Sequence, residues 1–148
     1  MPRPTDDVRA RARYSLNDLR PGTERTHSYR VPQTLADGFI EMFEDTSPVH
    51  VDDDFARAWG FHRRLVHGSV LNGFLSHFVG TVMPGASGLL LATSLRYAFP
   101  IYADAIVELK ARIARRVVDE RVVVLVVSFE DTLRGAMLAR GTAHVAIT

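Results

Sequence analysis

The chain has 148 residues, of which 47% are hydrophobic and 24% are charged, and its formal net charge is +1. This composition is typical of one globular domain, and the near-neutral charge gives no reason to expect a nucleic-acid partner. The absence of cysteine excludes disulfides, thiolate nucleophiles and cysteine-bound metals.

Residues 1–24 mix proline, aspartate and arginine with little apolar periodicity, and Pro21 with Gly22 marks a turn near the end of this stretch. We expect an N-terminal arm over residues 1–24, either a flexible tail or a segment that wraps the domain, followed by a single domain over residues 25–148. No segment approaches the roughly 18 apolar residues of a membrane span. We therefore expect a cytoplasmic protein that does not enter a membrane.

The first elements of the domain are short. Residues 25–31 predict a strand, and apolar residues at helical spacing over 35–43 predict a helix. Further on, Asp52 or Asp53 is a good N-cap for a short helix that Gly60 ends.

The stretch FEDTSPVHVDDDFA, residues 43–56, places an acid and an imidazole on either side of a helix breaker. Pro48 forbids a helix through the segment and favours an extended conformation at Ser47, so the chain must turn between Asp45 and His50. A turn can bring together two side chains that a regular helix or strand would separate. An acid/base pair is one interpretation, because imidazole exchanges protons near neutral pH. The alternative is that Asp45 only caps the turn.

From Gly68 to Met83 two apolar stripes recur at a period of 3.6 residues. Small residues lie between the stripes, so we expect a buried central helix over residues 68–83. It opens on VHGS, where a glycine lets a ligand approach the backbone N–H. A helix N-terminus favours an oxygen that gains negative charge, as in the enolate of a thioester. The alternative is that Gly68 only permits close packing.

From residue 87 onward the apolar period changes from 3.6 to 2, which predicts four antiparallel strands. In the first strand we expect Leu89, Leu91 and Leu95 to share one face. In the second, apolar residues over 107–113 alternate with charged ones, and in the last Met137 is expected on the inner face. The sequence therefore predicts an α+β domain in which an antiparallel sheet packs on one long helix.

The six histidines suggest no metal site. No pair has HExxH spacing, and His62 with His67, five residues apart, does not match the i, i+4 geometry of two helical ligands. Neither a GxSxG elbow nor a glycine-rich phosphate loop is present. We therefore expect no metal, no serine-hydrolase triad and no nucleotide-binding loop.

The segments DTSPVHVDDDFARAWGF and RLVHGSVLNGFLSHFVG together resemble the MaoC-like (R)-specific enoyl-CoA hydratases, whose motif runs approximately Gly-Asp-x-Asn-Pro-x-His. The likeness lies in the Asp-to-His spacing, the intervening proline and the His-Gly pair that enters the central helix. It implies a hotdog fold, in which the sheet wraps around the central helix, and a homodimer or larger homo-oligomer. Two positions depart from the motif, because Glu44 replaces the usual glycine and Ser47 replaces the usual asparagine.

The resemblance also implies roles for individual residues. Asp45 and His50 would activate water and relay a proton, the N–H of Gly68 would bind the thioester oxygen, and Ser76 would help to order the site. The implied reaction is the reversible hydration of a trans-2-enoyl thioester, on coenzyme A or acyl carrier protein, to the (R)-3-hydroxyacyl thioester, without a cofactor. A hotdog acyl-thioesterase and a non-catalytic acyl-binding subunit remain alternatives.

Overall fold

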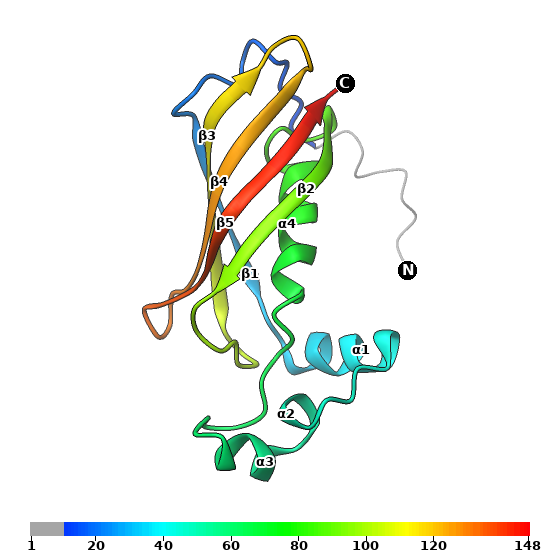
Figure 1. Cartoon of the computed structure of the whole chain (residues 1–148), viewed down its shortest axis with the longest axis vertical. Coiled ribbons are helices and arrows are strands. Elements are labelled where there is room, and N and C mark those ends of the chain that lie inside the picture. Colours follow the sequence, from blue (N-terminus) through cyan, green and yellow to red (C-terminus); the bar gives the residue numbers. More distant parts are fainter. Residues whose placement is uncertain (1–10) are drawn as a thin grey trace.

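A computed structural model describes residues 11–148, which form a five-stranded antiparallel sheet and four helices, as Figure 1 shows. The predicted α+β class is confirmed. The strand order is β1-β3-β4-β5-β2, so β1 and β2 are the edge strands. In chain order the elements are β1 (Glu24–Arg30), α1 (Gln33–Phe43), α2 (Pro48–Val51), α3 (Asp53–Ala58), α4 (Val70–Thr81), β2 (Gly88–Tyr97), β3 (Ile106–Val117), β4 (Val122–Asp131) and β5 (Ala136–Ile147).

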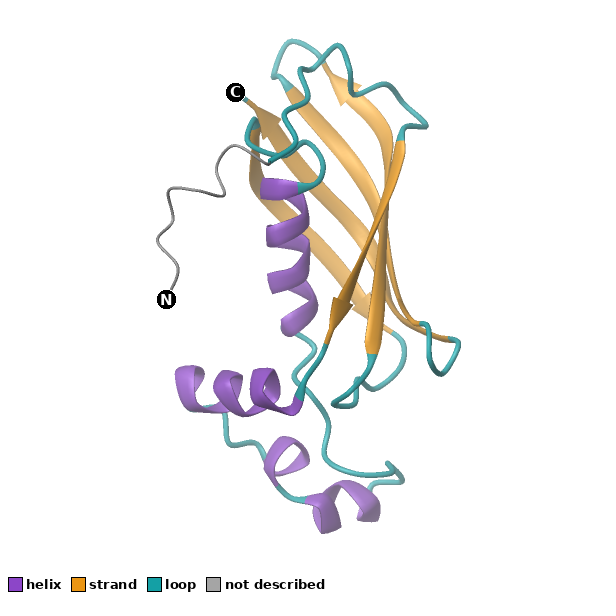
Figure 2. Cartoon of the chain, turned by 180° about the vertical axis from the view of Figure 1, so that it is seen from behind, coloured by secondary structure: helices purple, strands orange, loops and turns teal. Residues whose placement is uncertain are grey.

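The long helix α4 lies against one face of the sheet (Figure 2). Leu71, Leu75 and Phe78 recur at helical spacing and are fully buried in the core. The opposite side of the same segment is exposed in the single chain, at positions that include Gly73 and Ser76. Helix α4 spans Val70–Thr81 and is shorter than the predicted 68–83. The expectation that all of its faces are buried is wrong for the exposed stripe of small and polar residues that includes Gly73 and Ser76.

The strand alternation predicted over residues 107–113 is confirmed, because every second residue is fully buried. These are Val107, Leu109, Ala111 and Ile113. In β5, however, the core residue is Leu138 and not Met137. The register of β4 with β5 shifts between Phe129 and Glu130, so one residue of β5 is inserted at this point.

The expectation that Leu89, Leu91 and Leu95 share one face of β2 is wrong. The register with β5 shifts between Leu90 and Ala92, which inserts one residue and reverses the alternation. Leu90 and Leu95 consequently pack on the core, whereas Leu89 and Leu91 are exposed. An apolar alternation cannot reveal such an insertion, because all the residues concerned are leucine or other apolar types.

The described part of the N-terminal arm lies against the domain. Arg13 forms a β-bridge with Gly85, and the side chain of Leu19 is fully buried. Arg116 Nη1 donates a hydrogen bond to the Leu16 carbonyl at 3.0 Å. Residues 11–23 therefore wrap the sheet and α4, while the first ten residues of the predicted arm lie outside the described residues. Over the described range, none of the helices has both the length and the apolar character of a membrane span.

Candidate active site

The turn between Asp45 and His50 has the conformation predicted for it. Ser47 is extended, with φ −51° and ψ 130°, and Pro48 is the first residue of the one-turn helix α2. His50 belongs to α2, and Asp45 lies just beyond the end of α1. A carboxylate oxygen of Asp45 and a ring nitrogen of His50 lie within 4.8 Å of each other. The turn thus brings together the two side chains that the sequence places on either side of the proline.

The ring of His50 is oriented by the backbone of residue 65. Its Nδ1 lies 2.8 Å from the carbonyl oxygen of Leu65, and the N–H of Leu65 donates to the carbonyl of Val49 at 2.9 Å. A carbonyl oxygen can only accept, so Nδ1 carries a hydrogen and donates it. In the neutral ring this leaves the lone pair on Nε2, which can then accept a proton.

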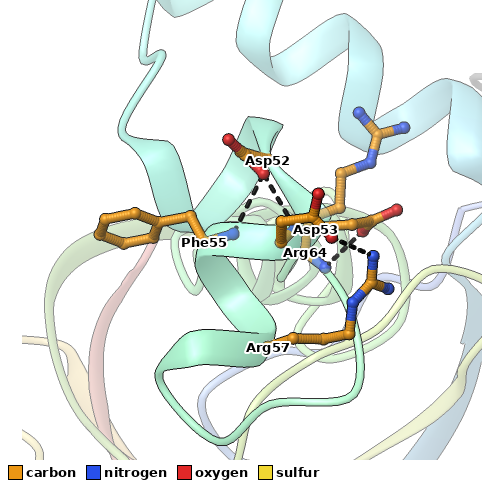
Figure 3. A network of polar contacts seen from close by, with 6 residues as sticks. Asp52, Asp53, Phe55, Arg57 and Arg64 are labelled. Atoms are coloured by element: carbon orange, nitrogen blue, oxygen red, sulfur yellow. Dashed lines mark hydrogen bonds and ion pairs between the residues drawn. The ribbon is translucent and has the colours of Figure 1, made fainter.

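The segment 61–67, which contains the carbonyl that orients His50, is anchored by hydrogen bonds to two different parts of the structure. Asp52 caps α3 by accepting hydrogen bonds from the N–H groups of Asp54 and Phe55, and Asp53 accepts one from the N–H of Arg64 at 2.8 Å (Figure 3). The predicted N-cap is therefore confirmed. On the other side, the N–H of Val66 donates to the carbonyl of Ile101 at 2.8 Å, in the loop before β3. The segment that orients His50 is thus attached both to α3 and to the body of the domain.

A third side chain, His67, joins the pair. Its ring is 4% exposed and stacks on that of His50, with centroids 3.7 Å apart and an interplanar angle of 25°. Its Nε2 lies 3.2 Å from Asp45 Oδ2, and the Asp45 side chain is 46% exposed. From the sequence, His67 was considered only as a metal ligand with His62, so its contact with Asp45 was not predicted. The sequence signal that could have placed His67 at the site was its position immediately before Gly68 in the VHGS segment.

Asp45, His50 and His67 are also the residues that could hold a metal ion, because one potential ligand atom of each lies within 4.8 Å of the others. A ligating imidazole holds the metal close to its own ring plane, with an N–metal distance of about 2.0–2.1 Å. Two rings stacked 3.7 Å apart direct their nitrogens side by side and not toward one point. The arrangement suits acid–base chemistry better than chelation, and the absence of a metal stays a prediction.

Gly68 lies at the entrance to α4 with its N–H available. Among residues 11–148 this N–H donates no hydrogen bond to a backbone carbonyl. Gly68 and His50 line the same pocket, of about 430 Å³, whose wall includes the ring of Tyr97. A Cβ atom at position 68 would lie 3.0 Å from Cε1 of that ring, so a larger residue there would require the ring to shift slightly.

A larger apolar groove of about 1080 Å³ runs between α1 and α4. Asp45 lines one part of it, and Phe39, Phe43 and Phe74 contribute aromatic walls. Ser69 lines both this groove and the pocket that contains His50 and Gly68, so the two hollows adjoin at the start of α4. The acid and the imidazole therefore lie where an apolar groove meets a pocket with a free N–H.

Ser76 is not brought to the pair in the single chain. It is exposed on α4 and lines neither hollow, whereas Ser69, two turns earlier on the helix, lines both. The role that the resemblance implies for Ser76 stays a prediction.

The backbone conformation at Glu44 accounts for the glycine that usually precedes the aspartate of the motif. It is the C-cap of α1 and has φ 53° and ψ 24°, in the left-handed region that favours glycine. We expect Glu44→Gly to raise the free energy of unfolding by about 1 kcal/mol, because the strain of a side chain in this conformation is removed. The measurement is a urea denaturation curve of each protein.

Glu41→Gly is the matched control, since Glu41 is an exposed residue within α1. This substitution should lower the free energy of unfolding by about 1 kcal/mol, because glycine is unfavourable inside a helix. Equal losses of stability in the two variants would contradict the strain at Glu44.

The chain is similar to known proteins over most of its length. A family model described as the MaoC-like domain matches residues 18–138. An (R)-specific enoyl-CoA hydratase of Aeromonas caviae is 28% identical over 88% of this chain and 97% of its own length, and a 3-hydroxybutyryl-CoA dehydratase of Methylorubrum extorquens is 28% identical over 72% and 68%. Among solved structures, the (R)-hydratase from A. caviae superposes with a TM-score of 0.80 at 26% identity, covering 88% of this chain and 98% of that one.

Proposed function

Because this chain belongs to the MaoC-like domain family, we propose that it catalyses the reversible hydration of a trans-2-enoyl thioester to a 3-hydroxyacyl thioester with the (R) configuration. One observation carries the proposal: the turn at Pro48 brings the Asp45 carboxylate and a His50 ring nitrogen within 4.8 Å. The names of the relatives, which are hydratases and dehydratases of acyl thioesters, support the same reaction class.

In the proposed reaction a water molecule lies between Asp45 and His50 and gives up a proton to this pair as its oxygen bonds to C3. The electrons of the C2=C3 double bond move toward the thioester, whose oxygen gains negative charge. The N–H of Gly68 is proposed to donate a hydrogen bond to that oxygen. A proton held by the pair then passes to C2, so that one water molecule is added in all.

The apolar groove beside Asp45 supports an acyl group as the substrate's reacting end. An acyl chain gains roughly 0.8 kcal/mol for each CH₂ that it buries. We propose that the acyl chain lies between α1 and α4 and that the thioester oxygen lies near Gly68. The proposed carrier is coenzyme A or acyl carrier protein, since both present the acyl group as a thioester.

The test is a panel of crotonyl, longer enoyl and ring-substituted thioesters on both carriers, followed by the loss of absorbance of the conjugated enoyl group. An (R)-3-hydroxyacyl product supports the proposal. A free thiol as the only product would indicate a thioesterase. Binding of acyl thioesters without any turnover would indicate a non-catalytic acyl-binding subunit.

We also propose a homodimer in which the β2 edge strands of two copies pair. An edge strand has backbone groups free to pair with another chain, and β2 carries exposed apolar residues, including Leu89 and Leu91. Light scattering should give twice the chain mass of 16.5 kDa. A monomer at micromolar concentration would contradict this assembly.

Gly68→Val tests the proposed contact to the thioester oxygen. The variant keeps the N–H but places a branched side chain in the pocket, so we expect turnover to fall by about 10²-fold, as when an oxyanion donor is lost. The melting temperature should change little, because the ring that the new side chain meets belongs to Tyr97, which is half exposed and can move.

The control is Tyr97→Ala in the Gly68→Val background, which removes the ring that a Cβ at position 68 would contact. Recovery of turnover in this double variant would attribute the loss to displacement of Tyr97. Normal kinetics in Gly68→Val alone would remove the proposed role of its N–H.

A further inference from the structure

His67 is fixed between two aromatic rings that come from different helices. Phe39 of α1 stacks on one side, with ring centroids 4.4 Å apart, and His50 of α2 on the other, at 3.7 Å. The interplanar angle is 25° in both cases. The ring therefore has little freedom to rotate, and its edge is held toward Asp45.

The contacts of this edge determine which nitrogen carries the hydrogen. Nε2 of His67 lies 3.2 Å from the backbone oxygen of Asp45 and 3.2 Å from its carboxylate Oδ2. Both oxygens are acceptors, so Nε2 must be the donor. Nδ1 is buried and has no partner among the described residues. A lone pair is tolerable there, whereas an N–H would be a buried donor without an acceptor.

The surroundings also keep His67 uncharged. Burial, and then the neighbouring His50, lower the pKa of His67 below its usual value, and the attraction of Asp45 opposes this only in part. A neutral donor differs from an arginine or lysine at the same place. It orients the carboxylate without pairing it with a full positive charge.

Asp45 needs such a contact, because its side chain is almost half exposed. The hydrogen bond that the carboxylate accepts comes from the backbone N–H of Ser47, at a long 3.3 Å. Among the described residues, His67 is the one side chain with a nitrogen within ion-pairing distance of this carboxylate, at 3.2 Å. Without it the acid could rotate out of line with His50.

We propose that His67 is a positioning residue, whose neutral ring, held between Phe39 and His50, fixes the carboxylate of Asp45 through the Nε2 hydrogen. This inference rests on the proposed hydratase function. It adds a residue to which the sequence motif assigns no role. His67 does not contact the reacting atoms and acts through Asp45.

Two substitutions separate the N–H from the ring. His67→Phe keeps an aromatic ring between Phe39 and His50 but removes the donor, and His67→Gln keeps a donor but removes the ring. Misplacement of a reacting group by about 1 Å can cost about 10²-fold in rate, so we expect kcat of His67→Phe to fall by this order with little change in KM. His67→Gln should retain more of the wild-type kcat, although it loses the stacking.

His62→Phe is the matched control, because His62 is exposed and lines neither hollow. It should keep the wild-type kcat. Wild-type kcat in His67→Phe would overturn the proposal, and so would a kcat that follows the melting temperature of the variants instead of the presence of a donor.

A second measurement does not depend on activity. Nitrogen-15 NMR of histidine-labelled wild-type protein at pH 7 should show His67 as a neutral ring with its hydrogen on Nε2. A hydrogen on Nδ1, or a charged ring, would overturn the proposal even if both His67 variants fail to fold. If wild type hydrates no thioester, the proposed function fails by itself, while the NMR result still decides whether His67 donates to Asp45.

Discussion

Leu75→Asp should leave little folded protein. Leu75 is fully buried at the centre of the face that α4 presents to the sheet. The substitution removes a core side chain, which costs about 2–5 kcal/mol, and introduces a carboxylate that cannot be solvated there. A domain of this size has a total stability of about 5–15 kcal/mol, so the combined loss is comparable with the whole. Circular dichroism and the soluble yield measure the outcome.

Leu133→Asp makes the same chemical change at a position that is 64% exposed, in the turn between β4 and β5. It should change the melting temperature little, because the charge stays in water. A soluble Leu75→Asp variant with the melting temperature of the control would mean that α4 does not form the core as described.

Periodicity was sufficient to predict the longer elements that bury one face in the core, such as β3 and α4. The strand alternation over residues 107–113 and the helical spacing over 35–43 both appear in the structure as expected. Periodicity failed at β2, where a bulge at Leu91 reverses the faces. The bulge depends on how β2 pairs with β5, and no local pattern records this pairing.

The burial of α4 was overestimated for a related reason. Small residues such as Gly73 and Ser76 are compatible both with close packing and with exposure, so composition alone does not decide between the two. In the single chain this stripe is exposed, and at Gly73 it lines the groove beside Asp45. A stripe of small residues on a helix was therefore a weaker sign of burial than the leucines and phenylalanines of the other face.

The candidate site was predictable where it is local in sequence. Pro48 required a turn between Asp45 and His50, and the structure has this turn. The contact of His67 with Asp45 joins residues 22 positions apart and depends on the path of residues 61–67 past α2. The motif's preference for glycine at position 44 is explained by the backbone conformation in the structure. Position 44 ends α1 in the left-handed region, and the sequence alone does not show this.

Asp45→Asn and His50→Gln should each greatly reduce hydration while leaving the fold intact. Asparagine keeps an oxygen that can accept from the N–H of Ser47 and from His67, but it has no ionisable carboxylate. Glutamine at position 50 stays polar but lacks the imidazole nitrogen that accepts a proton. General acid–base groups contribute about 10²- to 10⁴-fold, so losses of this size are expected in kcat for an enoyl thioester that wild type hydrates.

The double variant Asp45→Asn, His50→Gln distinguishes a pair that acts as one unit from two independent groups. If one water molecule is activated between the two side chains, removing either group already disables the step, and the double variant should be little slower than the poorer single variant. Independent groups would instead multiply their losses. Asp119→Asn and His62→Gln make the same changes at exposed positions away from the pair and should keep wild-type rates. Circular dichroism establishes that every variant is folded, and near wild-type rates in both single variants would show that hydration does not use this pair.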